Sequence, residues 1–152
     1  MNPLFKKRKS VRNFLEEEIE KEKLEEILKV IESSPSAGNL KAREVLIVKE
    51  KDLRQELAKA SFNQSFVSQA PVVLIFFALP EKSKQVYGER GENLYALQDA
   101  TISCAYAWLE AVNMGLGACW VGAFDEKKIK EILKVSEDWR PVALLTLGYP
   151  AE

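Results

Sequence analysis

The run of seven apolar residues from Val72 to Ala78 constrains the fold more than any other stretch of the chain. Prolines at positions 71 and 80 bound it, and it is rich in β-branched and aromatic side chains. The run is too short to cross a membrane. A strand with no polar side chain on either face has to be covered on both faces. Residues 72–78 are therefore predicted to form the central strand of a sheet with helices packed on it.

Helical patterns and shorter apolar runs alternate along the rest of the chain. Leu24, Ile27, Leu28 and Ile31 are spaced as one face of a helix over residues 20–32. Further helices are predicted at 2–7, 52–60, 94–114 and 125–135, and further strands at 45–48, 116–121 and 142–147. The 45–48 strand is expected to be buried on both faces, and the polar segment 81–93 to be a surface loop that orders on binding. This alternation predicts an α+β sandwich in a single domain over residues 1–152.

Composition excludes several classes of chemistry. The chain has no histidine, which excludes Ser-His-Asp catalysis and histidine-ligated metals, and we predict no metal site. Cys104 and Cys119 lie in apolar stretches without a CxxC pair. Buried free thiols are typical of a reducing compartment, so we expect a cytoplasmic protein with no membrane partner. No GxGxxG or Walker motif is present. If the chain is an enzyme, a cofactor should carry the reactivity.

The segment from Lys6 to Arg12 concentrates positive charge near the start of the chain, with five basic residues among seven. Arg8, Ser10 and Arg12 alternate, so on an extended backbone they would share one face and could clamp a phosphate. The alternatives are a solvated charge run or a tail that contacts nucleic acid. The net charge of −1 and the five glutamates between positions 16 and 22 argue against nucleic acid.

Four separated segments resemble the FMN-dependent nitroreductase family. They are Arg8–Phe14, Ser34–Asn39, Asn63–Val67 leading into Ala70–Val73, and Gly115–Phe124 followed by Arg140–Pro150. The segments follow the family's order over nearly the whole chain. The resemblance implies a nitroreductase-like fold, with a central mixed sheet flanked by helices, and a homodimer that holds FMN at its interface. The long apolar helix expected at 94–114 would suit such an interface.

The resemblance also implies roles for individual residues near the cofactor. Arg8 and Ser10, with Lys9 beside them, match the residues that hold the FMN phosphate. Arg12 matches the cation near flavin N1 and O2, where positive charge favours reduction of the ring. Asn63 matches an amide that contacts the pyrimidine edge of the flavin. Taken alone, Asn63 could equally be a helix cap.

Two further groups of residues complete the implied site. Gly122 and Ala123 match the strand-end residues whose backbone N–H groups face flavin N5 and O4, although Gly122 alone could be a plain turn. A loop contributed by the partner subunit is matched by Pro35, Ser36, Ala37 and Asn39. Trp108 and Trp120 are expected in the core, and Asp99 is assigned no role.

The implied activity is an FMN oxidoreductase in which NADH or NADPH reduces the flavin, leaves, and is replaced by an acceptor such as a nitroaromatic or a quinone. No side chain acts as the catalyst; Arg12 stabilises charge. The alternative is a flavin- or nucleotide-binding module without turnover. Two features favour this alternative. Many relatives carry Asn-x-Gln-Pro-Trp where this chain has Asn39 followed by Leu40–Arg43, and relatives continue with a basic tail where this sequence ends at Glu152.

Overall fold

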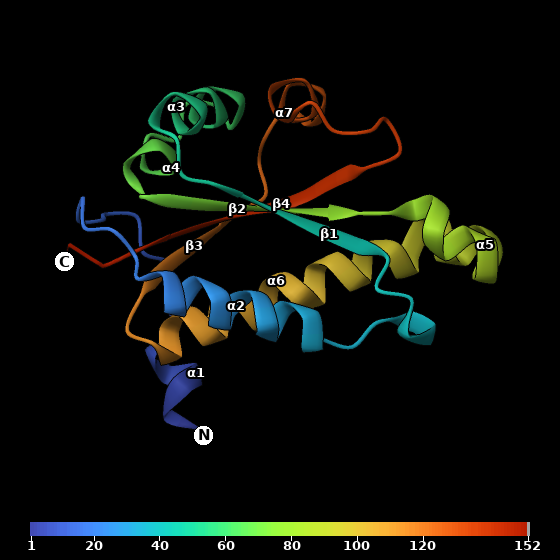
Figure 1. The fold of residues 1–152 in the computed structure, drawn as a ribbon, viewed down its shortest axis with the longest axis horizontal. Coiled ribbons are helices and arrows are strands. Elements are labelled where there is room, and N and C mark those ends of the chain that lie inside the picture. Colours follow the sequence, from blue (N-terminus) through green and yellow to red (C-terminus); the bar gives the residue numbers. More distant parts are fainter. Residues whose placement is uncertain (152) are drawn as a thin grey trace.

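A four-stranded sheet in the order β1-β2-β4-β3 forms the middle layer of the molecule (Figure 1). The computed structural model describes residues 1–151. The regular elements are α1 (Pro3–Lys7), α2 (Lys21–Ser33), β1 (Arg43–Val48), α3 (Lys51–Ala60), α4 (Phe66–Gln69), β2 (Val72–Ala78), α5 (Pro80–Arg90), α6 (Ala96–Asn113), β3 (Gly117–Val121), α7 (Glu126–Leu133) and β4 (Arg140–Gly148). A short 3₁₀ turn lies at Ala37–Asn39, and a π-helical turn at Gly91–Tyr95 joins α5 to α6.

The strand β2 is central and fully buried, as the sequence predicts. It pairs with β1 on one side and β4 on the other, both antiparallel. Its side chains alternate between two cores: Leu74 and Phe76 pack on one face of the sheet, and Ile75 and Phe77 on the other. The apolar run therefore serves both layers at once, because alternate residues of a strand point to opposite faces.

Helices cover both faces of the sheet (Figure 1). On one face, α2 and α6 bury Leu24, Ile27 and Cys104 against the sheet. On the other, α3, α4 and α7 bury Leu57, Val67 and Ile129. The predicted helices and strands at these positions are confirmed, with boundaries shifted by a few residues. Both cysteines are buried and free, as expected.

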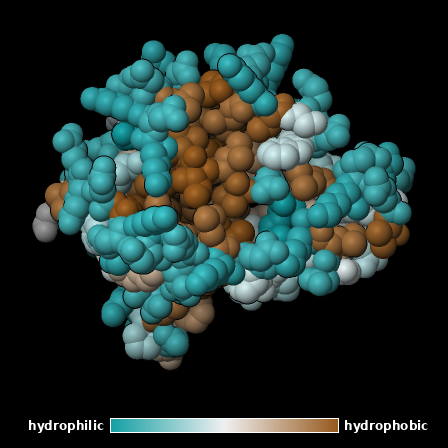
Figure 2. Space-filling view, in the orientation of Figure 1, coloured by the Kyte–Doolittle hydropathy of each residue, from teal (hydrophilic) through white to brown (hydrophobic). Residues whose placement is uncertain are grey.

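Two local predictions are wrong. The strand β1 is not buried on both faces, since Ile47 is 36% exposed and Val45 and Leu46 are only half-buried. The reason is topological: β1 is an edge strand with one neighbour. Figure 2 shows an apolar area in the middle of the face where β1 runs in Figure 1. Residues 81–93 form α5 and the start of the π-helical turn, not a loop.

The sheet also differs from the expected mixed arrangement. All three strand pairs are antiparallel. The parallel pairing that the structure contains is an isolated bridge between Ser10 and Ala118, outside the named strands. None of the helices within residues 1–151 is long and apolar enough to traverse a bilayer.

A polar network fastens the start of α2 to the end of β4. The Lys23 ammonium donates to the Tyr149 hydroxyl at 2.8 Å and to the Met114 carbonyl at 3.0 Å. The Tyr149 hydroxyl donates to the Glu20 carboxylate, which also pairs with Lys23 at 3.2 Å. The hydrogen bond that Tyr149 donates is the main cause that lowers the pKa of Glu20, and the hydrogen bond that Lys23 donates to Tyr149 is the main cause that raises the pKa of Lys23.

Tyr149→Phe is expected to lower the melting temperature at pH 7 by about 2–4 °C, because the network loses its central hydroxyl. The lowered Glu20 pKa means that its contribution is present above the ordinary value of 4.5 and is lost as the pH falls. The raised Lys23 pKa means that its contribution is present below the ordinary value of 10.5 and is lost as the pH rises. The difference between the two proteins should therefore shrink at both extremes in a pH series of thermal melts.

Tyr87→Phe is the matched control, since Tyr87 is 39% exposed and its hydroxyl forms no hydrogen bond within residues 1–151. It should leave the melting temperature unchanged. A Tyr149→Phe protein that melts like the parent at pH 7 would contradict the role of the network.

Candidate functional site

The basic segment near the chain start lies along the outer edge of β3. Ser10 forms the parallel bridge with Ala118, and the Val11 N–H donates to the Ala118 carbonyl at 2.9 Å. Gly117 makes this approach possible, because a Cβ there would lie 2.9 Å from the Val11 side chain. Phe14 is buried and bridges Pro150. Val11 and Phe14 thus anchor the segment.

The two arginines of the segment diverge toward opposite layers. The Arg8 guanidinium lies over the Trp108 ring of α6 at 4.7 Å, and the Arg12 guanidinium over the Phe66 ring of α4 at 5.9 Å. They do not form the single clamp that their alternation predicts, because each stacks on a ring from a different face of the sheet. The geometry separates Arg8 from Arg12 and leaves Ser10 between them.

A surface cavity of about 460 Å³ opens beside this segment. Its lining residues are Lys9, Ser10, Val11, Arg12, Asn13 and Pro150. The lining includes two cations and a hydroxyl but no carboxylate. None of the ion pairs formed within residues 1–151 uses Arg8, Lys9 or Arg12. A cavity lined by unpaired cations is suited to a phosphate or another anion.

The Cys119 thiol lies beneath the same segment, in contact with Ser10 and Arg12. Burial raises the pKa of this thiol, while the Arg12 charge and the hydrogen bonds with Ser10 and Arg12 oppose the rise only in part. Cys119 is therefore a neutral thiol at pH 7. It lies under the segment and is not a nucleophile.

The loop after α3 meets the end of β3. The Gln64 amide donates to the Ser61 carbonyl at 2.9 Å and to the Ala123 carbonyl at 3.2 Å. The Asp125 N–H donates to the Ala60 carbonyl at 2.8 Å. These bonds bring the turn that contains Asn63 next to Ala123, as the implied site requires.

Asn63 itself has a left-handed backbone, with φ of 60°, and its side chain is exposed. It does not cap α4, which begins after Ser65 without a side-chain cap. Asn63 lines a second cavity of about 440 Å³ together with Gln55, Lys59 and Ser68. The structure thus places Asn63 in the wall of a different cavity from that of Arg12.

Gly122 directly follows β3 and has an open approach to its backbone. Among residues 1–151, the only side chain within 4 Å of a Cβ built there is Trp120, whose indole nitrogen would lie 3.6 Å away. Trp120 tilts toward Trp108, with ring centroids 6.5 Å apart. The half-buried Trp pair joins the core as expected, and it also links Arg8 to Gly122 along the β3 edge. A planar ligand could reach the N–H groups of Gly122 and Ala123 from outside.

The Pro35–Asn39 loop lies elsewhere. It contacts α6 at Asp99, whose carboxylate accepts from the Ala37 N–H at 3.1 Å, whereas Arg8 stacks at Trp108. Nine residues of helix separate these two points, or about 13.5 Å along the axis. Figure 1 shows the loop and β3 near opposite ends of the fold. Pro35, Ser36, Ala37 and Asn39 therefore do not join the cavity of their own chain.

Several contacts around the cavity were not predicted from the sequence. Asn13 accepts from the Gln69 amide at 3.1 Å, and Gln64 connects the Asn63 turn to Ala123. Phe66 supports Arg12. Asn13, Gln64 and Phe66 all lie in the segments that resemble the nitroreductase family. Their position in those segments was the one sign in the sequence that they lie near the site. Their partners depend on the tertiary fold.

Comparison with known proteins supports the same reading of the fold. The model of the family described as "Nitroreductase family" matches residues 5–66 and 60–149. A solved nitroreductase family protein from Clostridium novyi NT superposes with a TM-score of 0.90 and 32% identity, covering 99% of this chain and 84% of that chain. A solved FMN-dependent nitroreductase from Clostridium difficile R20291 gives 0.88 and 30%, covering 100% of this chain and 88% of that one.

Curated proteins of similar sequence carry names that fit the same family. A Methanocaldococcus jannaschii protein that carries the name nitroreductase is 34% identical over 71% of this chain, which spans 53% of that protein. A Thermus thermophilus protein named NADH dehydrogenase is 29% identical over 96% of this chain and 84% of its own length. With a family model that matches most of its length and solved relatives at 30% identity or more, the chain belongs to the nitroreductase family.

Proposed function

We propose that the chain is an FMN-dependent oxidoreductase that uses NADH or NADPH to reduce small electron acceptors such as nitroaromatics and quinones. Relatives are named FMN reductase [NAD(P)H] in Bacillus subtilis and Oxygen-insensitive NADPH nitroreductase in Salmonella typhimurium. The observation that carries the proposal is the cavity lined by Lys9, Ser10 and Arg12, beside the edge strand β3 that Gly122 follows. Lys9 and Arg12 form no ion pair within residues 1–151.

The residues present fit the cofactor. Arg8, Lys9 and Ser10 would hold the phosphate, since they offer cations and a hydroxyl at the edge of the fold. Gly122 carries no side chain that would block a flat ring from its backbone N–H. Arg12 is supported by Phe66, so its charge has a defined position. The chemistry that FMN would supply there is hydride and electron transfer between the nicotinamide and the acceptor.

The side chains contribute binding and electrostatics. Arg12 would place positive charge where the ring gains electron density, and the N–H groups of Gly122 and Ala123 would donate hydrogen bonds to its polar edge. Cys119 stays protonated and takes no proton. The chain's role is thus to orient the ring and to stabilise developing charge.

A homodimer would complete this site. The Pro35–Asn39 loop cannot reach the cavity of its own chain, so a second copy would have to supply it. The outer face of α6 is apolar enough for such an interface: Tyr106 is 40% exposed, and Ile102, Leu109 and Val112 are only half-buried. Leu109 and Val112 lie three residues apart, on one face of the helix.

An anaerobic titration tests the proposed activity. Purified protein mixed with FMN should show a bound flavin spectrum, and NADH or NADPH should bleach it without oxygen present. A flavin that binds but resists both nicotinamides would favour a binding module without turnover. A protein that retains no flavin after mixing with excess FMN would refute the proposal.

Arg12→Ala should weaken FMN binding about tenfold, because one charge-assisted contact is removed, and should also slow reduction of the bound flavin. Lys7→Ala is the matched control, since Lys7 is an exposed cation at the end of α1, outside the cavity. Flavin fluorescence titration measures the affinity of each variant. Equal losses in both variants would point to a diffuse charge effect, and unchanged affinity for Arg12→Ala would remove that residue from the site.

A further inference from the structure

A buried carboxylate holds the Pro35–Asn39 loop at the start of α6. Asp99 is 2% exposed and lies among the apolar residues of α6 and β2. One carboxylate oxygen accepts from the Ala37 N–H, and the other accepts from the Ala42 N–H, each at 3.1 Å. The two bonds hold the turn at both of its ends, at Ala37 and at Ala42. Asp99 therefore acts as a cap for a loop rather than for a helix.

The turn between these two amides has an unusual backbone. Gly38, Asn39 and Lys41 all have positive φ, between 52° and 61°. Gly38 also lies against the Tyr87 hydroxyl, which would be 2.4 Å from a Cβ built on Gly38. A left-handed backbone at a non-glycine residue persists only when its surroundings enforce it. The Asp99 carboxylate supplies part of that constraint.

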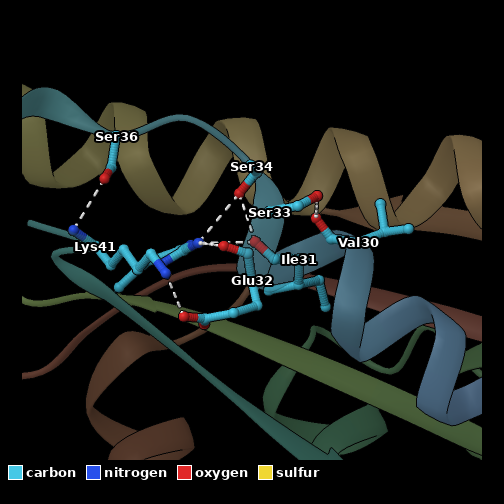
Figure 3. Close-up of polar contacts among 8 residues, drawn as sticks. Val30, Ile31, Glu32, Ser33, Ser34, Ser36 and Lys41 are labelled. Carbon is cyan, nitrogen blue, oxygen red and sulfur yellow. Dashed lines mark hydrogen bonds and ion pairs between the residues drawn. The ribbon is translucent and has the colours of Figure 1, made fainter. Parts of the chain in front are cut away.

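A second clamp holds the other side of the loop. Arg43 is 7% exposed, and its guanidinium donates to the Ile31 carbonyl at 2.7 Å and to the Ser34 hydroxyl at 3.3 Å. The Ser36 hydroxyl accepts from the Lys41 N–H at 2.9 Å, and Lys41 pairs with Glu32. Figure 3 shows Ser34, Ser36 and Lys41 gathered beside the last turn of α2. Each stem of the loop is thus tied to a helix.

The Asp99 carboxyl lies in a buried position. Burial raises its pKa above the ordinary value, and the N–H bonds from Ala37 and Ala42 and the charge of Arg43 oppose that rise only in part. A buried carboxylate is tolerated where its oxygens are satisfied, and here both are bonded to the loop. The loop is the only hydrogen-bonding partner of the Asp99 side chain within the described part of the chain.

We propose that Asp99, with Arg43, is a positioning residue that presents the Pro35–Asn39 loop to the cofactor of the partner subunit. This proposal rests on the proposed function. Asp99 would never touch the flavin. It would fix the geometry of the loop before FMN binds. The free energy of FMN binding would then not be reduced by the cost of ordering the loop.

Asp99→Ala should weaken FMN binding about tenfold, because both backbone anchors are lost. Asp99→Asn keeps the shape and one acceptor, so it should lose less. Asp99→Asn also provides the test if the Asp99→Ala protein does not fold. Ser103→Ala is the control, since Ser103 is equally buried on α6 and bonds only to its own helix at the Ala100 carbonyl. In the flavin-free proteins, hydrogen exchange at Ala37 and Ala42 should accelerate in the Asp99 variants and not in Ser103→Ala.

Mixed dimers separate a positioning role from simple destabilisation. A chain with Asp99→Ala is paired with a chain carrying Arg12→Ala by co-expression with two tags. If the loop serves the partner's cofactor, one site of this dimer is intact and the other has both defects. One FMN per dimer should then bind with the parent affinity. Pairing a doubly substituted chain with a parent chain should give two weakened sites and no tight one.

The outcomes are distinct. A parent protein that binds no FMN refutes the proposed function, and the positioning role with it. A parent protein that binds FMN, together with Asp99 variants of unchanged affinity and unchanged exchange at Ala37 and Ala42, overturns only the positioning role. Two weakened sites in the first mixed dimer, together with one tight site in the second, would also overturn it, because the Asp99 defect would then act within its own chain.

Discussion

The structure of the candidate site depends on the docking of residues 10–14 against the outer edge of β3. One backbone hydrogen bond, from the Val11 N–H to the Ala118 carbonyl, and the bridge of Ser10 to Ala118 hold the segment in place. Gly117 admits Val11, and buried Phe14 fixes the far end. A sheet edge that would otherwise expose unpaired backbone groups is thereby covered by a basic segment. Without this docking the charges of Arg8, Lys9 and Arg12 would lie on a mobile tail.

The second constraint is the length of α6. Trp108, toward one end of the helix, supports Arg8, while Asp99, toward the other, supports the Pro35–Asn39 loop. A rigid helix keeps these two halves of the implied site apart within one chain. The same helix has an apolar outer face. Both features are accounted for if two copies pack so that the loop of one meets the cavity of the other.

Much of the fold could be predicted from local pattern. The central strand followed from an apolar run, and α2 followed from helical spacing, because burial dictates side-chain period. The edge position of β1 could not be predicted, since its apolar run resembles that of a central strand and only the topology exposes it. The sequence of residues 81–93 predicts a loop, because nearly all of these residues are polar and Gly88 and Gly91 are typical of turns. The role of Asp99 was missed because its partners are backbone groups some 60 positions away.

The docked basic segment is proposed to form a phosphate site. A comparison of FMN with riboflavin tests this most directly, because the two ligands differ only in the phosphate. Affinities measured by fluorescence titration at one low salt concentration should favour FMN by about a hundredfold, with a preference that falls as salt is added. Equal affinities for FMN and riboflavin would show that Arg8, Lys9 and Ser10 hold no phosphate, and would contradict the account.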